Sequence, residues 1–181
     1  MNKKCDLILL LSGGMDSTIL LRMALGMGFT PYCLLFDYGQ KHIQELEMAK
    51  AQCDKYELDY SIIPIDLNVH SKLTDGSAKY SNVSPWHVPS RNLIFLSFAT
   101  SLAESEGINL IWYGANYEDR VNLFPDCYQE WVYAMNNLLT KNGSRVIVVE
   151  APLLGMGKET IKKLAVVYNI NENEIFSGYG E

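Results

Sequence analysis

The feature that most constrains this chain is a glycine-rich turn, SGGMDS at residues 12–17, between an apolar run and a helical pattern. The apolar run, residues 6–11, is typical of a strand that is covered on both faces. Residues 17–27 carry apolar side chains at helical spacing. A buried strand, a tight turn and a helix in this order indicate the beginning of a parallel α/β sheet.

Strand and helix patterns alternate along the rest of the chain. Apolar runs predict strands at residues 31–36, 60–65, 110–113 and 145–149, and helical spacing predicts helices at 44–56, 90–106, 129–139 and 158–168. We expect the helix at 90–106 to be buried, because it is apolar on nearly all sides. Right-handed crossovers then give a doubly wound, parallel five-stranded sheet. Without a repeat or linker, residues 1–181 are expected to form a single α/β domain.

Two local features refine this topology. Pro64 lacks a backbone N–H group, which places the end of the third strand near a sheet edge or a bulge. Residues 66–86 are polar and have no clear period. A loop of this length within a compact domain is usually a lid or a binding loop.

Composition and charge narrow the class of protein. The 181 residues are 48% hydrophobic and 20% charged, which is typical of an ordered domain with its own core. No apolar run is long enough for a membrane span. The net charge of -6 and the lack of a basic run argue against direct binding of nucleic acid, because phosphate neutralisation needs clustered Lys and Arg. We therefore expect a small-molecule partner.

The cysteines and the N-terminal residues indicate a reducing compartment. Cys5, Cys33, Cys53 and Cys127 are scattered and form no CxxC pair, so we expect buried or idle thiols rather than disulfides. The apolar run at residues 7–11 is too short for a signal peptide and lacks a cleavage site. The protein is expected to be cytoplasmic.

The glycine-rich turn has the composition of a phosphate site. Gly13 and Gly14 allow several N–H groups to point toward one place, and the following helix adds the positive end of its dipole. Ser12 and Ser17 add hydroxyl donors. Asp16 is unfavourable beside phosphate unless a divalent cation lies between them, so Mg²⁺ is expected. The competing interpretation is a plain turn in which Asp16 or Ser17 caps the helix.

The pattern SGGxDS resembles the pyrophosphate loop of the N-type ATP pyrophosphatases, and it is neither a Walker motif nor GxGxxG. Those enzymes cleave ATP between the α and β phosphates to adenylate a substrate oxygen. The resemblance implies a fold of the adenine nucleotide alpha hydrolase-like (HUP/PP-loop) type. The residues it assigns to ATP binding are Leu11, Ser12, Gly13, Gly14, Met15, Asp16, Ser17 and Thr18, with Mg²⁺ held between Asp16 and the phosphates.

Five further motifs narrow the resemblance. The loop is followed by FDYGQKH at 36–42, VPSRN at 88–92, YGAN at 113–116, PDC at 125–127 and APL at 151–153. In order and spacing these resemble the 7-cyano-7-deazaguanine synthase (QueC) family over about residues 7–164. The resemblance implies an AMP-forming, ATP-dependent C–N ligase. It would adenylate 7-carboxy-7-deazaguanine, form the amide with ammonia, and convert the amide to the nitrile with a second ATP.

A deazaguanine base presents two parallel donors, N1–H and the 2-amino group, which one carboxylate can accept. Asp126, Asp119 and Glu118 follow the fourth strand, where open α/β sheets bind ligands. We favour Asp126, whose alternative role is a helix N-cap. Tyr38, Trp86 and Trp112 are candidates to stack on the base, although aromatic residues are more often core. The expected substrate-binding residues are Tyr38, Gln40, Arg91, Asn92, Asn116, Asp119 and Asp126.

The expected catalytic residues are Asp16, Arg91, Lys158 and His42. Arg91, at a helix start, is suited to hold the substrate carboxylate or the adenylate phosphate; a surface ion pair is the alternative. Lys158 would reach the phosphates, unless it is a solvated first-turn lysine. His42 would move a proton as ammonia attacks, unless it is simply exposed.

The chain departs from the resemblance near residue 178. The QueC pattern ends with four cysteines that hold zinc, whereas Gly178 stands where the first is expected and no CxxC follows. We therefore expect no zinc site and interpret the chain as a shortened form. Such an enzyme either completes the nitrile or stops at 7-amido-7-deazaguanine, a modified nucleic-acid base or its precursor.

Other functions and partners stay open at this point. The chain could be another adenylating enzyme with the same loop, acting on a different acid or on tRNA, or a non-catalytic ATP-binding module. No glutaminase nucleophile is evident, so ammonia would come free or from a separate amidotransferase. A homodimer is compatible with such a chain, because twofold dimers are the commonest assemblies.

Overall fold

The computed structural model describes residues 4–41, 43–67, 69–74, 87–121, 124–143 and 145–176. Within these ranges, five strands form one parallel sheet in the order β3-β2-β1-β4-β5. The central strands are β2 (Pro31–Asp37), β1 (Leu7–Leu10) and β4 (Leu110–Trp112), and the edges are β3 (Tyr60–Pro64) and β5 (Val148–Glu150). The predicted parallel five-stranded sheet is confirmed.

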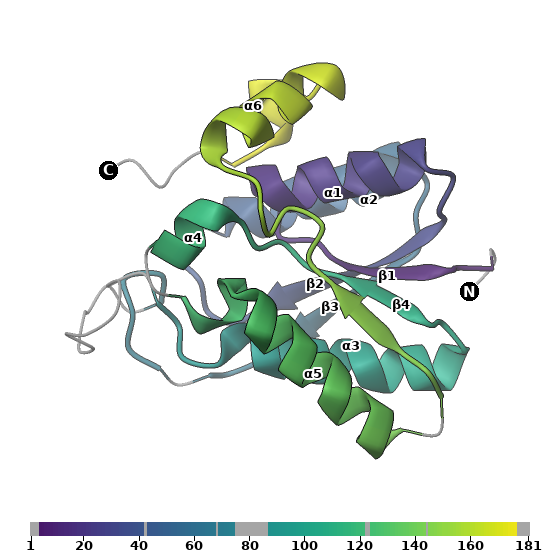
Figure 1. Ribbon diagram of the computed structural model, residues 1–181. Helices are drawn as coiled ribbons and strands as arrows, with labels where there is room; N and C mark the ends of the chain where they lie inside the picture. The colour runs from purple at the N-terminus through teal and green to yellow at the C-terminus, as the bar shows by residue number, and fades with distance from the viewer. Residues whose placement is uncertain are drawn as a thin grey trace.

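Helices cover both faces of the sheet (Figure 1). One face carries α1 (Met15–Gly26) and α2 (Gln44–Lys55), with α6 (Lys158–Val167) packed on α1. The other face carries α3 (Arg91–Glu106) and α5 (Gln129–Asn142). The doubly wound arrangement is therefore confirmed. The short elements α4 (Tyr117–Val121), η1 (Pro125–Cys127) and η2 (Glu172–Glu174) were not predicted, since single turns carry too little periodicity.

The central strand β1 divides the core into two layers. Leu7 and Leu9 pack toward α1 and α2, whereas Ile8 and Leu10 pack toward α3 and α5. All four side chains are buried, because helices cover the sheet on both sides. This double burial is the reason that the strand has a continuous apolar sequence.

Two predictions about individual elements were wrong. Helix α3 is buried on one face only, since Leu93 and Phe98 are 40% and 45% exposed while Phe95 and Leu96 lie in the core. The exposed face of α3 also carries apolar residues, so the sequence of this helix shows no clear amphipathic period. Strand β5 begins at Val148 rather than at residue 145, because pairing with β4 starts there.

Both edges of the sheet have side chains that limit further pairing. In β5, the Val149 N–H donates to Asn136 Oδ1 (2.8 Å) and Asn136 Nδ2 donates to the Val149 carbonyl oxygen (2.9 Å). The main-chain N–H and carbonyl of Val149 point away from β4, because the Val148 N–H and the Glu150 carbonyl oxygen bond to the β4 side of the strand. At the other edge Pro64 ends β3, as the sequence predicted.

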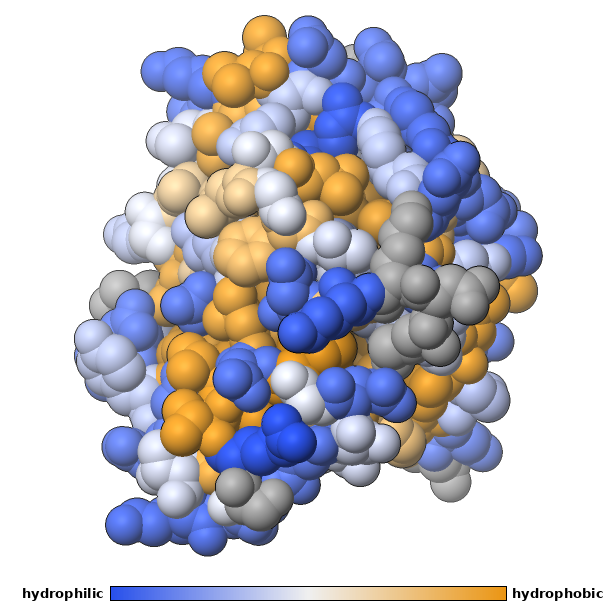
Figure 2. Space-filling model, turned by 90° about the vertical axis from the view of Figure 1, so that its right-hand side faces the viewer, coloured by the Kyte–Doolittle hydropathy of each residue, from blue (hydrophilic) through white to orange (hydrophobic). Residues whose placement is uncertain are grey.

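The cysteines and the outer surface agree with the sequence analysis. Cys5, Cys33, Cys53 and Cys127 are buried, and the described residues contain no disulfide between them. No helix in the described part of the chain is long and apolar enough to cross a membrane. Figure 2 views the side where the N-terminus lies, and shows apolar surface interrupted by polar and charged side chains.

Candidate active site

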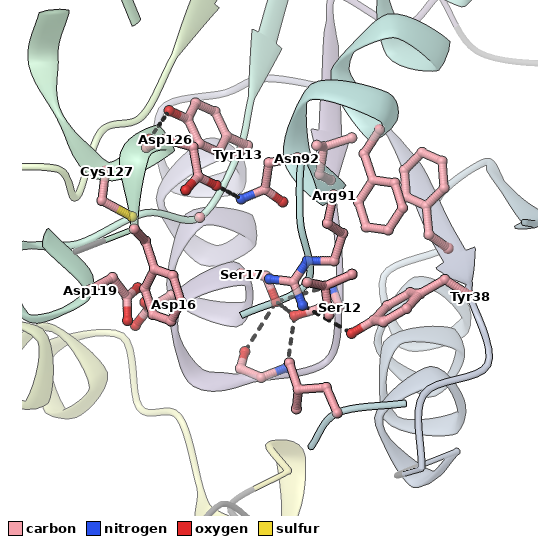
Figure 3. Close-up of a pocket in the computed structure, with 18 of the residues that line it drawn as sticks. Ser12, Asp16, Ser17, Tyr38, Arg91, Asn92, Tyr113, Asp119, Asp126 and Cys127 are labelled. Atoms are coloured by element: carbon pink, nitrogen blue, oxygen red, sulfur yellow. Dashed lines mark hydrogen bonds between the residues drawn. The ribbon is translucent and has the colours of Figure 1, made fainter. Parts of the chain in front are cut away.

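The carboxyl ends of the strands open into one continuous pocket of about 850 Å³. Its lining comes from the turn after β1, the turn after β2, the beginning of α3, the segment after β4, and the first residue of α6. The phosphate-site motif and the four later motifs through PDC therefore reach the same cavity. Figure 3 shows Ser12 and Ser17 at one end of the labelled group and Asp126 at the other.

Glycine is required at residue 13 of the loop. Its φ is +85°, a conformation that other residues rarely adopt. A Cβ atom at this position would also collide with the main-chain carbonyl oxygen of Glu45 in α2. The loop can therefore lie directly against α2 only because Gly13 has no side chain.

The loop hydroxyls form a compact network around Gly14. Ser12 Oγ and Ser17 Oγ are 3.0 Å apart, and Ser12 Oγ accepts from the Gly14 N–H at 3.3 Å. Thr18 Oγ1 donates to the Gly14 carbonyl oxygen at 2.8 Å. Leu11, Ser12, Gly14, Met15, Asp16 and Ser17 line the pocket. Gly13 and Thr18 are buried and do not line the pocket: Gly13 packs against α2, and Thr18 holds the Gly14 carbonyl oxygen.

The first turn of α1 supplies the main donors for an anion. Gly14 is the N-cap residue and, as a glycine, has no side chain that could cap the helix. The N–H groups of a helix's first turn have no acceptor within the helix, and the helix dipole favours negative charge beside them. Neither Asp16 nor Ser17 is the N-cap, so the plain-turn interpretation does not account for them.

Asp16 is held at the pocket wall by Asn116. The Asn116 amide donates to Asp16 Oδ2 at 2.6 Å, and Asn116 Oδ1 accepts from the Asp119 N–H at 3.0 Å. Burial raises the pKa of Asp16, and the Asn116 hydrogen bond opposes that rise. Asn116 was predicted to bind substrate; the structure places it in the pocket with its amide committed to Asp16.

Asp119 adds a second carboxylate beside Asp16. Burial, together with the charges of Asp16 and Asp126, raises the pKa of Asp119 to about 6, while Arg91 and Lys158 oppose this rise. Figure 3 shows the side chains of Asp119 and Asp16 close together. Such a carboxylate exchanges its proton near neutral pH, which is suited to acid–base chemistry.

At the far end of the pocket, Asp126 lies on η1 and is oriented by two neighbours. Asn92 Nδ2 donates to Asp126 Oδ2, and the Tyr113 hydroxyl donates to the Asp126 carbonyl oxygen at 2.7 Å. Helix α5 is capped by Tyr128, so Asp126 is not its N-cap residue. Burial raises the pKa of the neighbouring Cys127 thiol, which therefore stays protonated.

Arg91 lies between the two ends of the pocket, with Tyr38 beside it (Figure 3). Arg91 NH1 donates to the Tyr38 hydroxyl at 3.0 Å, and the guanidinium carbon is 5.5 Å from the centre of the Tyr38 ring. It therefore lines the pocket instead of forming only a surface ion pair. Gln40 also lines the pocket, but its amide is used to hold the turn, bonding to Tyr38 N and the Phe36 carbonyl oxygen.

The remaining predicted residues fall into three groups. Lys158 lines the pocket, close enough to Asp16 and Asp119 to influence both carboxylates. His42 and Trp86 lie outside the described residues. Trp112 was wrongly considered for stacking, because it is 3% exposed and its Nε1 donates to Glu150 Oε2 at 2.8 Å, away from the large pocket.

The family model of "Queuosine biosynthesis protein QueC" matches residues 6–181. The chain belongs to the QueC family. A 7-cyano-7-deazaguanine synthase from Thermoplasma volcanium is 37% identical over 186 residues, covering 95% of this chain and 77% of that protein. The synthase from Picrophilus torridus is 40% identical over 174 residues, covering 87% of this chain and 71% of that protein.

Solved structures support the fold of this QueC-family chain. The U34-tRNA thiolase NcsA from Methanococcus maripaludis has a TM-score of 0.61 at 15% identity, covering 94% of this chain and 59% of that chain. A predicted subunit of tRNA methyltransferase from Methanocaldococcus jannaschii has a TM-score of 0.58 at 21% identity, covering 90% of this chain and 76% of that chain. The adenine nucleotide alpha hydrolase-like (PP-loop) fold is thus confirmed.

Two parts of this QueC-family pocket were missed by the sequence analysis. The rings of His87 and Phe124 stack with centroids 5.6 Å apart and planes inclined by 22°, and both line the cavity. Ile175 and Phe176, beyond α6, line it as well. The aromatic pair joins segments far apart in the chain, so no local pattern could reveal it. His87 directly precedes the VPSRN motif, which was the one available signal.

Proposed function

We propose that this chain is an ATP-dependent ligase that adenylates the carboxylate of 7-carboxy-7-deazaguanine and replaces AMP with ammonia. The observation that carries this proposal is the shared pocket, which has a phosphate loop at one end and the Asp126 carboxylate at the other. The many relatives named 7-cyano-7-deazaguanine synthase support the same substrate class.

In this proposal the loop and the start of α1 bind the phosphates of ATP. The half-buried Asp16 fits a role beside Mg²⁺, because a nearby cation would offset the desolvation that raises the pKa of Asp16. The described residues contain no cluster of three ligating side chains, which suits an ion held mainly by phosphate oxygens. Bound Mg²⁺ would neutralise charge on the leaving pyrophosphate.

The deazaguanine base would bind at the Asp126 end. The Asp126 carboxylate can accept both the N1–H and the 2-amino group, and its bond from Asn92 fixes its orientation. The stacked rings of His87 and Phe124 provide a flat wall for the heterocycle. Burial lowers the pKa of His87, which favours the neutral ring at pH 7.

The reaction would take place near Arg91, between the two ends. A carboxylate oxygen of the acid attacks the α-phosphorus of ATP, and pyrophosphate leaves toward the loop. Ammonia then attacks the acyl carbon, loses a proton, and displaces AMP to give the amide. Arg91 would hold the reacting carboxylate, Lys158 would hold phosphate oxygens, and Asp119 has a pKa suited to accept the proton.

The second step proposed is dehydration of the amide. Its oxygen attacks the α-phosphorus of a second ATP, again releasing pyrophosphate. Loss of the nitrogen's two protons and of AMP leaves the nitrile, 7-cyano-7-deazaguanine. The same adenylating groups serve both steps, so an enzyme that stops at 7-amido-7-deazaguanine remains the second candidate. We further propose one domain over residues 1–181, with free ammonia or a separate amidotransferase as the nitrogen source.

The test is mass spectrometry of a reaction containing the acid, ATP, Mg²⁺ and ammonium, with AMP measured in parallel. Nitrile with two AMP per product supports the complete synthase. Amide with one AMP supports the adenylating ligase and identifies the shorter reaction. Absence of AMP with the wild-type chain, under conditions in which ATP binds, would overturn the proposal. The variant D16N is the control and is expected to form neither product.

A further inference from the structure

The segment after α6 returns to the phosphate loop. The Phe176 N–H donates to the Gly13 carbonyl oxygen at 3.0 Å, and residues 14 and 176 form an isolated parallel bridge. Ile175 is 8% exposed, and both Ile175 and Phe176 line the pocket beside the loop. The loop is thus paired with a segment from the opposite end of the described chain.

This pairing determines what the loop can present to a ligand. An anion site must offer N–H groups, while a carbonyl oxygen directed at phosphate would repel it. The Gly13 carbonyl oxygen accepts from Phe176, and the Gly14 carbonyl oxygen accepts from Thr18 N at 3.1 Å and Thr18 Oγ1 at 2.8 Å. Both glycine carbonyl oxygens therefore already accept hydrogen bonds from groups of the protein.

Glu174 anchors the returning segment by its charge. Its Oε1 lies 2.9 Å from Lys55 Nζ in α2, and its Oε2 lies 3.7 Å from Arg22 NH1 in α1. Asn171 Nδ2 also donates to Glu174 Oε1, at 3.3 Å. The hydrogen bond from Lys55 lowers the pKa of Glu174, so the carboxylate is ionised at neutral pH.

Gln52 connects the same segment to the loop from below. Its Nε2 donates to the Glu174 carbonyl oxygen at 2.7 Å and to Thr18 Oγ1 at 2.9 Å. Thr18 Oγ1 in turn donates to the Gly14 carbonyl oxygen. Gln52 is 4% exposed, so this relay is shielded from water. A continuous chain of hydrogen bonds therefore joins the returning segment to the glycine turn.

We propose that residues 174–176 form a clasp that holds the glycine turn in its phosphate-binding conformation, with Glu174 and Gln52 as positioning residues. Glycines lose the most conformational freedom when they are ordered, so a turn that is ordered beforehand binds its ligand more tightly. The clasp contributes the Phe176 N–H to this order and no group to the reaction. It extends the proposed function, because the ligand whose binding it improves is ATP.

The sharpest test compares F176P with F176A. Both variants remove the ring, but only F176P also removes the N–H group that bonds to Gly13. The dissociation constant of Mg·ATP, measured by calorimetry without any acid substrate, is expected to be three- to tenfold higher for F176P than for F176A, about the effect of one hydrogen bond. Equal dissociation constants for the two variants would overturn the clasp.

A second pair tests the anchor without proline. E174Q removes the charge that binds Lys55 and Arg22, whereas E159Q removes a carboxylate from a surface pair with Lys162 on α6. E174Q is expected to raise the KM for ATP about three- to fivefold and to leave kcat and the KM for the acid unchanged. E159Q is expected to change none of these three constants. A fall in Tm with an unchanged KM for ATP would assign Glu174 a structural role only.

These measurements separate the clasp from the proposed reaction. If the wild-type chain does not bind Mg·ATP, the proposed function and the clasp both fail, because ATP is the ligand of both. If the wild type binds Mg·ATP and F176P binds as F176A does, the clasp fails and the ligase proposal stands.

Discussion

The side-chain amide of Asn116 donates a 2.6 Å hydrogen bond to Oδ2 of Asp16, joining two residues that are 100 positions apart in the sequence. The bond links the segment after β4 to the first turn of α1. It also opposes the rise in the pKa of Asp16 that burial causes. The orientation and charge of the Asp16 carboxylate therefore depend on a residue in the segment that follows β4.

Loss of this bond is expected to reduce ATP turnover. N116A removes a hydrogen bond to a carboxylate, worth about 1.5–3 kcal/mol, and raises the pKa of Asp16 further. We expect kcat/KM for ATP to fall about 10- to 100-fold in assays of AMP release. N136A is the matched control, because Asn136 bonds to Val149 at the edge of β5. It should lower Tm while kcat/KM stays near the wild-type value.

Asp119 is expected to make the protein less stable as pH rises. Its pKa of about 6 lies above the ordinary 3.8, so the folded chain binds this proton more tightly than the unfolded chain does. The stabilisation is present below about pH 4 and is lost as pH rises through 6. D119N should raise the free energy of unfolding at pH 7 by up to about 3 kcal/mol and change it little at pH 4.

Urea unfolding at both pH values checks this prediction. The variant E47Q is the control, because Glu47 is exposed on α2 and lies outside the pocket. An equal change in unfolding free energy for D119N at pH 4 and pH 7 would contradict the assignment.

Substitution of Asp126 should affect the acid without affecting ATP. D126N retains the shape of the side chain but replaces one acceptor oxygen by a donor, which opposes the donors of the base. We expect the KM for 7-carboxy-7-deazaguanine to rise about 100-fold, since each bond to the carboxylate is worth about 1.5–3 kcal/mol. The dissociation constant of Mg·ATP, measured by calorimetry, should stay within about twofold of the wild-type value. A parallel loss of ATP binding would place Asp126 in the nucleotide half.

The aromatic wall gives a prediction that depends on ring shape. H87A removes one ring of the stacked pair, whereas H87F keeps an aromatic ring at this position. Stacking on an aromatic side chain is worth about 1–3 kcal/mol per base, so H87A should raise the KM for the acid about 5- to 100-fold. H87F should change it by less than about threefold. Similar KM values for H87A and wild type would show that the base does not contact this wall.

The sheet could be predicted because burial on both faces leaves a pattern in consecutive residues. Leu7 to Leu10 are apolar without a break, and the strand lies at the centre of the sheet. The glycine turn was also predictable from the sequence. Gly13 has a φ of +85° and lies directly against Glu45, and only glycine fits such a position, so the residue type itself marks the turn. These properties depend on immediate surroundings, which the sequence records locally.

Other features depend on contacts that leave no local pattern. The Phe176 bond to Gly13 is made by a main-chain N–H, which nearly every residue possesses. Thr18 has the polarity of a ligand-binding residue, yet it is buried beneath the loop and bonds to Gly14. The side-chain amide of Gln40 likewise forms hydrogen bonds to the main chain of its own turn, at Tyr38 and Phe36. Polarity in the sequence could not distinguish groups that bind a ligand from groups that support the site.

The Asn136 side chain has a consequence beyond its own helix. By pairing with both the N–H and the carbonyl of Val149, it occupies the hydrogen-bonding positions that an incoming strand would use. Unprotected sheet edges promote the joining of chains into extended aggregates. A copy of this chain that meets another at β5 therefore finds the outward-pointing N–H and carbonyl of Val149 already paired, which disfavours strand addition at this edge.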